Sequence, residues 1–208
     1  QPAALDLPGH GGSAPGGEDR IRAYAQWVRL SSEKLFAKRP FVLAGHSMGG
    51  AIVLELALDP PAGLSGLVLV GSGAKLAVTH AIFQMLAENP EAFFQSIDQF
   101  AFSSAAPQAS RERFVRVTRQ CPPSVIFNDF KACDHFDIRN RLPEIKLPTL
   151  VLCGEEDQLT PVKYSRYLHE NIAASRLVLI PQAGHVVMVE QPDLFNRAII
   201  SFLDTLGM

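Results

Sequence analysis

Residues 41–49 read Phe-Val-Leu-Ala-Gly-His-Ser-Met-Gly, and they are the strongest indication of the fold in this sequence. Its first four residues are apolar and predict a buried strand, while the apolar residues 51–58 predict a helix. The Gly-x-Ser-x-Gly motif between them is typical of a sharp strand-to-helix turn that exposes the serine hydroxyl. Glycines at positions 45 and 49 would remove side chains that collide in such a turn. The pattern therefore predicts that Ser47 is a nucleophile.

A serine nucleophile needs a histidine to take its proton and a carboxylate to hold that histidine. Residues 147–154 predict a second buried strand, and the loop after it carries Asp157. Residues 177–180 predict another strand, and the loop after it carries His185. Because open parallel sheets place their sites at the carboxyl ends of the strands, we expect these two side chains to meet Ser47 there. The sequence thus predicts a Ser-His-Asp triad.

Other acidic residues and histidines are weaker candidates for these roles. Asp134 and Asp137, close to the point where the strand pattern resumes, are the alternatives to Asp157. His46 leaves the turn in a different direction from the serine, so we expect it to pack or to form a hydrogen bond rather than to act as the base. The remaining histidines are assigned to a turn or to the surface: His10, His80, His135 and His169.

Together these motifs resemble those of the α/β-hydrolase superfamily, in particular its cap-bearing, serine esterase-like members, over essentially the whole chain. The order Ser47, Asp157, His185 is the order of that family, and residues 6–13 resemble the turn after its fourth strand. The resemblance implies an α/β fold in which a mostly parallel sheet is flanked by helices and carries a helical cap. It also implies that the backbone N–H of Met48 belongs to the oxyanion hole.

The pattern of apolar residues divides the chain into a core that is interrupted once. Strand signals stop after residue 73, and residues 74–142 predict short helices separated by prolines. The resemblance places the helical cap in this segment. We therefore expect residues 1–73 and 143–208 to form the α/β-hydrolase core and residues 74–142 to form the cap. Within the core, the sequence predicts helices over 21–36 and 194–206 and a further strand over 64–70.

Members of the family begin with three strands, whereas this sequence resembles them only from the fourth strand onward. The resemblance therefore implies that the N-terminal strands, with one loop of the oxyanion hole, are missing from the chain or supplied as a separate chain. Since the family's third strand lies between its fourth and fifth, residues 2–6 and 41–44 would then flank a vacant strand position. Direct pairing of residues 1–6 with residues 41–46 would contradict this hypothesis.

Nine of the thirteen phenylalanines lie in the expected cap. Small helical lids need aromatic side chains to hold together, so most of these residues predict a cap core. We expect the others to line a mostly apolar substrate pocket, with Phe83, Phe130 and Val186 as substrate contacts. A row of cap arginines at helical spacing predicts either a solvated helix face or a docking surface for an acidic carrier or carboxylated substrate: Arg111, Arg113, Arg116 and Arg119.

The composition, with 47% hydrophobic residues and a net charge of −2, is that of a well-packed enzyme. It gives no basic excess for binding nucleic acid or an anionic membrane, and no apolar run reaches the ~20 residues that span a bilayer. Three cysteines without metal-type spacing predict neither a disulfide framework nor a metal site, and favour a cytoplasmic location. We expect no cofactor and a small-molecule ester as the binding partner.

The resemblance implies a serine hydrolase that cleaves carboxylic esters with an apolar acyl or alcohol part through an acyl-enzyme intermediate. Similar triads also catalyse carbon–carbon bond hydrolysis, perhydrolysis and a lyase step in menaquinone synthesis, and these reactions are alternatives. A small-molecule receptor with a vestigial triad is the alternative from a different class. A serine at position 47 argues against the haloalkane dehalogenases and epoxide hydrolases of the family, whose nucleophile is aspartate.

Overall fold

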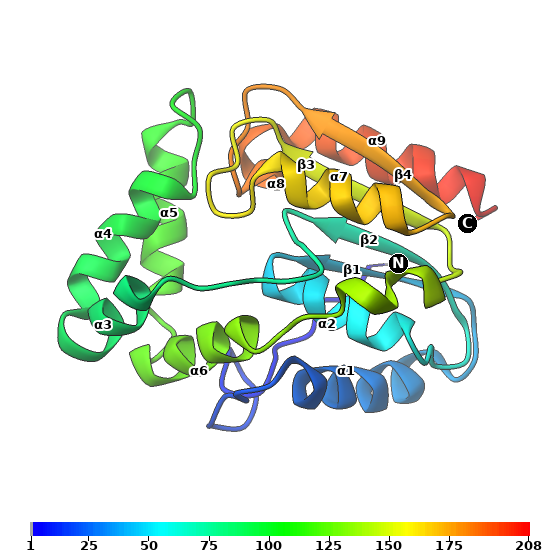
Figure 1. Cartoon of the computed structure of the whole chain (residues 1–208), viewed down its shortest axis with the longest axis horizontal. Helices are drawn as coiled ribbons and strands as arrows, with labels where there is room; N and C mark the ends of the chain where they lie inside the picture. The colour runs from blue at the N-terminus through cyan, green and yellow to red at the C-terminus, as the bar shows by residue number, and fades with distance from the viewer. Residues whose placement is uncertain (1) are drawn as a thin grey trace.

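A computed structural model describes residues 2–208, and a sheet of four parallel strands lies at its centre (Figure 1). The strands lie side by side in the order β1-β2-β3-β4, which is also their order along the chain. They comprise β1 (Phe41–His46), β2 (Leu64–Val70), β3 (Thr149–Gly154) and β4 (Ser175–Ile180). Because all four run in the same direction, their carboxyl ends lie at one edge of the sheet.

Helices connect the strands and cover both faces of the sheet (Figure 1). Those packed around the sheet are α1 (Ile21–Phe36), α2 (Met48–Ala57), α7 (Val162–Asn171), α8 (Val187–Glu190) and α9 (Pro192–Thr205). Between β2 and β3 the chain forms α3 (His80–Glu88), α4 (Pro90–Phe100), α5 (Gln108–Thr118), α6 (Pro123–Asp134) and the 3₁₀ helix η1 (Arg139–Glu144). Within residues 2–208, no helix has both the length and the apolar character needed to cross a membrane.

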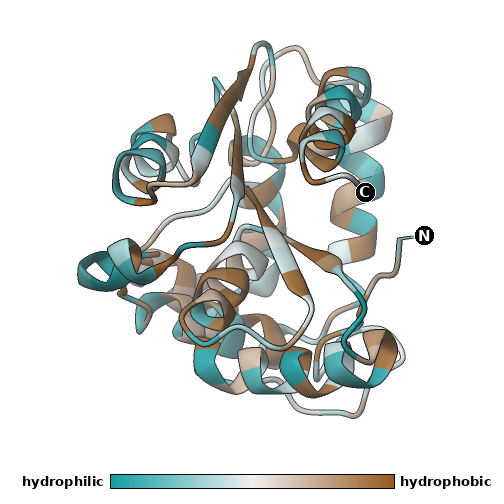
Figure 2. Ribbon diagram, turned by 90° about the vertical axis from the view of Figure 1, so that its right-hand side faces the viewer, coloured by the Kyte–Doolittle hydropathy of each residue, from teal (hydrophilic) through white to brown (hydrophobic). Residues whose placement is uncertain are grey.

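Alternate residues of β2 pack on opposite faces of the sheet, as the two-residue period of a strand requires. Leu67 and Leu69 belong to a buried cluster that also includes side chains of α1, α2 and α7. Val68 and Val70 belong to a second cluster, which includes Phe202 of α9. The apolar colour of the central strands in Figure 2 reflects this burial on both sides. The fold is therefore a sheet between two helical layers, as predicted.

The predicted bounds of α1 and β2 are confirmed residue for residue. Helix α1 carries Trp27, which packs against the first buried cluster. Helix α2 begins at Met48, three residues earlier than predicted, because the turn at the end of β1 leads directly into the helix. Helix α9 begins at Pro192, two residues earlier than predicted, because proline is favoured in the first turn of a helix.

Strand β1 differs from its prediction as a buried strand. Phe41 and Gly45 are buried, but Ala44 is exposed and the intervening residues are only partly covered. The reason is that β1 pairs only with β2 among the described residues, so it forms an edge of the sheet. Residues 2–6 form no strand and do not pair with β1, so the arrangement that would contradict the hypothesis of a vacant strand position is not present in residues 2–208.

The segment between β2 and β3 has an apolar core of its own, formed by buried side chains of α3, α4 and α6. Phenylalanines supply much of it through edge-to-face ring contacts, with Phe83 packed against Phe127 and Phe93 packed against Phe130. Where the chain enters and leaves the segment, an isolated antiparallel bridge joins Lys75 to Asp137. Figure 1 shows these helices grouped together at the side of the sheet to which the strands' carboxyl ends point.

A polar network ties the N-terminal turn to two helices. Asp129 of α6 accepts a hydrogen bond from the Tyr24 hydroxyl of α1 at 2.6 Å, and its second oxygen lies 3.0 Å from Nε2 of His10. The hydrogen bond with Asp129 raises the pKa of His10, although partial burial works against this. His10 therefore belongs to the turn, as predicted, and also bridges it to α6.

Candidate active site

Ser47 lies at the tip of the turn after β1, with backbone angles of φ 54° and ψ −118°. Few residues other than glycine adopt a positive φ, and such strain is found where the surrounding structure holds the residue in place, often at active sites. The Ser47 N–H donates to the carbonyl oxygen of Val70 at 2.9 Å, and the Ser47 carbonyl accepts from the Ser72 hydroxyl at 2.8 Å. Strand β2 and the loop after it thus fix the backbone of Ser47.

Close backbone approaches in this turn involve Gly45 and Gly50. A Cβ atom on Gly45 would lie 2.1 Å from the Gly49 carbonyl oxygen, and one on Gly50 would lie 2.5 Å from the Ser72 side chain. A Cβ atom on Gly49 would meet no atom within 4 Å. The prediction that a glycine avoids a collision is therefore confirmed at position 45 and wrong at position 49, where the chain turns away from its neighbours.

The structure brings Asp157 and His185 together from the loops after β3 and β4. His185 Nδ1 lies 2.9 Å from Asp157 Oδ2, and both residues are only 5% exposed. Asp157 also accepts hydrogen bonds from the Thr160 hydroxyl at 2.8 Å and from the backbone N–H groups of Leu159 and Thr160 at 2.9 and 2.8 Å. The carboxylate is therefore held by its own loop as well as by the histidine.

These surroundings keep the Asp157 carboxylate ionised. Burial works to raise its pKa, but hydrogen bonds and charge from His185, together with hydrogen bonds from Thr160, outweigh burial and hold the pKa below its ordinary value. A neutral imidazole then directs its Nδ1–H to the carboxylate, which leaves Nε2 as the acceptor. The pair can thus accept a proton at Nε2 and stabilise the imidazolium that results.

Gly71, the first residue after β2, lies against the Asp157–His185 pair. Its φ is +49°, and a Cβ atom would lie 3.1 Å from Asp157 Oδ2 and 3.2 Å from His185 Nδ1. Both the left-handed backbone and the close approach favour glycine at this position. The sequence marked residue 71 only as the end of a strand, so its contact with the pair was missed.

His46 connects the turn at Ser47 to the loop of His185. Its ring donates from Nε2 to the His185 carbonyl oxygen at 2.9 Å, and the two imidazole rings lie 4.5 Å apart at 47°. Burial and the neighbouring His185 lower the pKa of His46 to about 3, so this ring is neutral at neutral pH. Among residues 2–208 no hydrogen bond joins the Ser47 hydroxyl to His185, and such bonds often tighten only when substrate binds.

The two alternative carboxylates lie elsewhere and make other contacts. Asp134 accepts a hydrogen bond from the backbone N–H of Val78 at 3.0 Å. Asp137 pairs with Arg139 at 2.7 Å and with Lys75 at 3.5 Å. Neither carboxylate contacts His185, so the geometry favours Asp157 over both.

Residues predicted to contact substrate fall into two places. Val186, which directly follows His185 in the chain, is 2% exposed and packs with Phe102. Phe83 and Phe130 are only partly buried. Phe130 packs against the apolar core of the α3–α6 segment, and Phe83 contacts Phe127, which also packs against that core. Their contact with substrate stays a prediction.

The row of arginines on α5 is not uniform. Arg111 donates to the backbone oxygens of Asp98 and Ser103, and its guanidinium lies over the Phe102 ring. Arg119, just after α5, pairs with Glu91 and lies over the ring of Phe94. Arg113 and Arg116 are exposed. The row is therefore divided between packing contacts within the segment and solvent.

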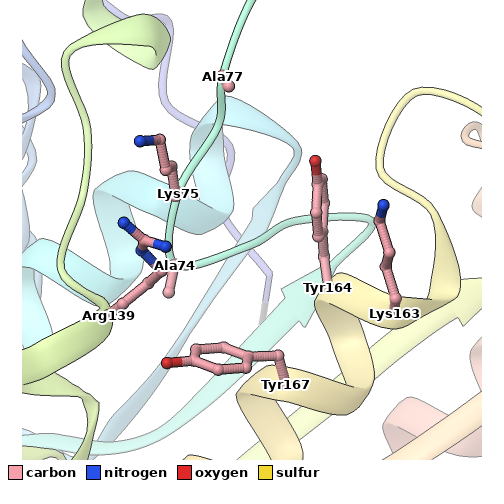
Figure 3. A pocket seen from close by; sticks show the side chains of 7 residues that line it. All are labelled: Ala74, Lys75, Ala77, Arg139, Lys163, Tyr164 and Tyr167. Carbon is pink, nitrogen blue, oxygen red and sulfur yellow. The ribbon is translucent and has the colours of Figure 1, made fainter.

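A cavity of about 440 Å³ opens between residues 74–77 and α7 (Figure 3). Three cations and two tyrosines are prominent in its lining: Lys75, Arg139, Lys163, Tyr164 and Tyr167. Lys75 and Arg139 both pair with Asp137. No residue of the predicted triad lines this cavity, and it is distinct from the pocket expected around Phe83, Phe130 and Val186.

Sequence reasoning missed two groups that hold the Asp157–His185 pair. An aspartate side chain commonly accepts from the backbone N–H two residues on, as Asp157 does from Leu159, so a signal for the turn that brings Thr160 to Asp157 was present. The second group is the segment 101–103 after α4, where the Ala101 carbonyl accepts from the N–H groups of His185 and Val186. No spacing in the sequence connects that segment to His185.

The parallel sheet, the strained serine after β1 and the Asp157–His185 pair define a hydrolase of the α/β class. The model of the family described as "Alpha/beta hydrolase family" matches residues 2–198, and this chain belongs to that family.

Three relatives illustrate the similarity. The chain is 31% identical over 175 residues to the putative carbamate hydrolase RutD of Agrobacterium fabrum, covering 78% of this chain and 67% of that protein. It is 27% identical over 221 residues to the pimeloyl-[acyl-carrier protein] methyl ester esterase of Vibrio atlanticus, covering 95% and 82%. A solved structure of a thermophilic esterase matches with a TM-score of 0.88 and 37% identity, covering 97% of this chain and 80% of that one. The chain is an enzyme with hydrolase activity, and these similarities support ester hydrolysis.

Proposed function

We propose that this protein is a serine hydrolase that cleaves small carboxylic esters through an acyl-enzyme intermediate, with Ser47, His185 and Asp157 as its catalytic residues. The observation that carries the proposal is the buried Asp157–His185 pair on the loops after β3 and β4, at the same sheet edge as the strained Ser47 after β1. The His185 ring also lies 4.5 Å from the ring of His46, which directly precedes Ser47. A serine nucleophile, an oriented base and an ionised carboxylate at one sheet edge are the parts that acyl transfer needs.

In the proposed reaction, His185 accepts the Ser47 proton while the serine oxygen attacks the ester carbonyl. Asp157 stabilises the imidazolium, and the proton then passes to the leaving alcohol. Met48, the first residue of α2, has an N–H that no helix carbonyl accepts, so it is placed to donate to the developing oxyanion. Water then attacks the acyl-enzyme with His185 as the base, which releases the acid and restores the serine.

For the substrate, we propose an apolar acyl or alcohol part bound between a core of residues 1–73 and 143–208 and a cap of residues 74–142. Support comes from Val186, which is buried against Phe102 beside the base, and from the aromatic interior of α3–α6. Two of the three relatives named above are called esterases, one of them acting on a methyl ester. The three cysteines form no disulfide among the described residues, which supports a reducing, cytoplasmic location.

The test compares wild type with Ser47→Ala on p-nitrophenyl acetate and butyrate. We expect Ser47→Ala to lower kcat by at least about 10⁴-fold, and we expect a fluorophosphonate probe to label wild type but not the variant. Ser65→Ala is the matched control, because Ser65 lies at the start of β2 and its hydroxyl bonds, within residues 2–208, only to the Gly63 carbonyl. Turnover that persists in Ser47→Ala would refute the proposed nucleophile. Labelling of Ser47 without multiple turnover would identify the receptor alternative instead.

A further inference from the structure

Glu190, the last residue of α8, joins the loop of His185 to the end of α4. Its Oε1 accepts a hydrogen bond from the Gly184 N–H at 2.9 Å, and its Oε2 accepts one from the Ser103 N–H at 2.8 Å. The short helix makes this reach possible, because the Glu190 N–H donates to the Val186 carbonyl one turn earlier. One carboxylate thus holds two backbone segments that lie 81 residues apart in the sequence, with Gly184 directly preceding the base.

The same two segments also touch through their backbones. The N–H groups of His185 and Val186 donate to the Ala101 carbonyl at 2.9 and 3.2 Å. A Cβ atom on Gly184 would lie 2.7 Å from the carbonyl carbon of Phe102 and from the nitrogen of Ser103. Because the backbones are this close, the loop of residues 181–186 that carries His185 (the base loop) cannot slide past segment 101–103. A displacement of that segment would therefore displace the base loop with it.

Arg111 anchors segment 101–103 from the opposite side. Its guanidinium donates to the Ser103 carbonyl at 2.5 Å and to the Asp98 carbonyl at 3.0 Å. Glu190 and Arg111 therefore bind the two polar backbone groups of a single residue, Ser103, one from the core and one from the cap. Charge-assisted hydrogen bonds of this kind are stronger than neutral ones.

We propose that Glu190 is a positioning residue, which fixes the base loop to the end of α4 so that the cap and the His185 imidazole take up their orientation together. This inference rests on the proposed function, because it assigns His185 the role of base. The carboxylate does not touch the reacting atoms. It acts through the Gly184 peptide, whose position determines whether His185 keeps its 2.9 Å contact with Asp157.

The first test is Glu190→Gln. Glutamine preserves the size of the side chain but supplies one acceptor oxygen where two N–H groups need one each. We expect kcat for p-nitrophenyl acetate to fall on the order of 10- to 100-fold, the loss that a small misplacement of a catalytic group produces. KM should change less than about 3-fold, because substrate contacts are untouched. The low-field proton resonance of His185 Nδ1–H should shift or broaden, a change that general destabilisation of a still-folded protein would not cause.

Glu91→Gln is the matched control, since Glu91 is an exposed cap carboxylate that pairs with Arg119 and lies away from the base loop. It should keep the kcat and the low-field resonance of wild type. A Glu190→Gln variant that is folded and has both properties unchanged would overturn the inference.

Arg111→Met keeps the proposal testable if Glu190→Gln does not fold. We expect Arg111→Met to lower kcat while KM changes little, as for Glu190→Gln. Where the double variant folds, its fold-loss in kcat should be smaller than the product of the two single fold-losses, because both residues hold Ser103. Wild-type kcat in Arg111→Met would contradict the shared anchor. Failure of the two proposals is distinguishable: an active Ser47→Ala removes the proposed function, whereas an inactive Ser47→Ala beside a fully active, folded Glu190→Gln removes only the role of Glu190.

Discussion

Asp157 and His185 at the sheet edge are held by more contacts than the one between them. Asp157 accepts from Thr160 and Leu159 in addition to His185, and the missing side chain at Gly71 leaves room for both members of the pair. His46 then connects the pair to the turn of Ser47. Orientation at the site is therefore set residue by residue, and single substitutions should separate charge from geometry.

Asp157→Asn should leave the geometry of the site largely intact but remove the charge that stabilises the imidazolium. Asparagine can also present its amide N–H₂ group to Nδ1, which favours the wrong tautomer of His185. We expect kcat to fall roughly 10³- to 10⁴-fold, measured with p-nitrophenyl acetate at pH 8. Glu156→Gln, an exposed neighbour on the same loop, should retain wild-type kcat. Activity of Asp157→Asn within tenfold of wild type would mean that another carboxylate serves the histidine.

His46 should make the folded protein sensitive to acid. Its pKa is about 3 in the folded protein against an ordinary value of 6.5, so between these pH values the unfolded chain binds a proton that the folded chain does not. The free energy of unfolding must therefore decrease as the pH falls below 6.5. Because pH 5 lies about 1.5 units below the ordinary pKa and well above the folded-state value, we expect a loss of about 2 kcal/mol at pH 5.

The corresponding measurement is urea unfolding of wild type and His46→Asn at pH 8 and pH 5. Relative to wild type, the variant should gain about 2 kcal/mol in free energy of unfolding on going from pH 8 to pH 5, because it lacks the group that must stay neutral. His80→Asn, at an exposed position of α3, should show the same difference from wild type at both pH values. A constant difference for His46→Asn would contradict the depressed pKa.

Among the elements, the junction between the loop that joins β4 to α8 and the end of α4 depends on a glycine. Gly184 brings the base loop within backbone contact of Phe102 and Ser103, while Glu190 spans the two segments. The loop after β4 and the end of α4 thus meet at Gly184 without an intervening side chain. An added methyl group at this junction has only backbone atoms to displace.

Gly184→Ala should therefore separate the loop from α4. We expect a loss of about 1–3 kcal/mol in the free energy of unfolding from the forced contact, together with a lower kcat because His185 follows Gly184. Gly12→Ala provides the comparison, since a Cβ atom there would approach no atom closer than 3.7 Å. Equal stability and activity of the two variants would show that the junction yields without cost.

How far the sequence predicts these elements depends on whether the signal is local. Helix α1 and strand β2 were predicted with their bounds, because each has a clear apolar period between turn residues. The burial of β1 was mispredicted, because exposure of a strand depends on its neighbours rather than on its composition. Ser47, Asp157 and His185 could be nominated because each follows a strand, whereas the bond from Ser103 to Glu190 joins positions 87 residues apart and leaves no pattern.

For the molecule as a whole, one network joins the N-terminal turn, α1 and α6. His10 and Tyr24 both meet Asp129, more than 100 residues away in the sequence. Since α6 belongs to the α3–α6 segment and α1 covers the sheet, this network holds two parts of the fold together. The raised pKa of His10 makes its share of the stability fullest below pH 6.5, and that share is lost as the pH rises through the folded-state pKa.

Asp129→Asn should lower the free energy of unfolding by about 1–3 kcal/mol, because the Tyr24 hydroxyl and His10 lose a charged acceptor. Chemical denaturation at pH 6 and pH 8 measures this, and the loss should be larger at pH 6, where the His10 contribution is greater. Asp204→Asn, an exposed substitution on α9, should change stability by less than about 0.5 kcal/mol at either pH. A larger loss at pH 8 than at pH 6 would contradict the assigned pairing.

The single tryptophan gives the protein a fluorescence signal that reports on one region of the fold. Trp27 lies on α1 against the first buried cluster, which includes Ala132 and Cys133 of α6 but no residue of α3, α4 or α5 among the described residues. Its emission therefore reports on the packing around the sheet and α6. Far-ultraviolet circular dichroism, by contrast, weights every helix, including α3, α4 and α5. Recording both signals in one denaturant titration therefore measures the cooperativity of the molecule. Coincident midpoints indicate a single unit, and an earlier dichroism transition indicates that α3–α5 melt while the sheet stays folded.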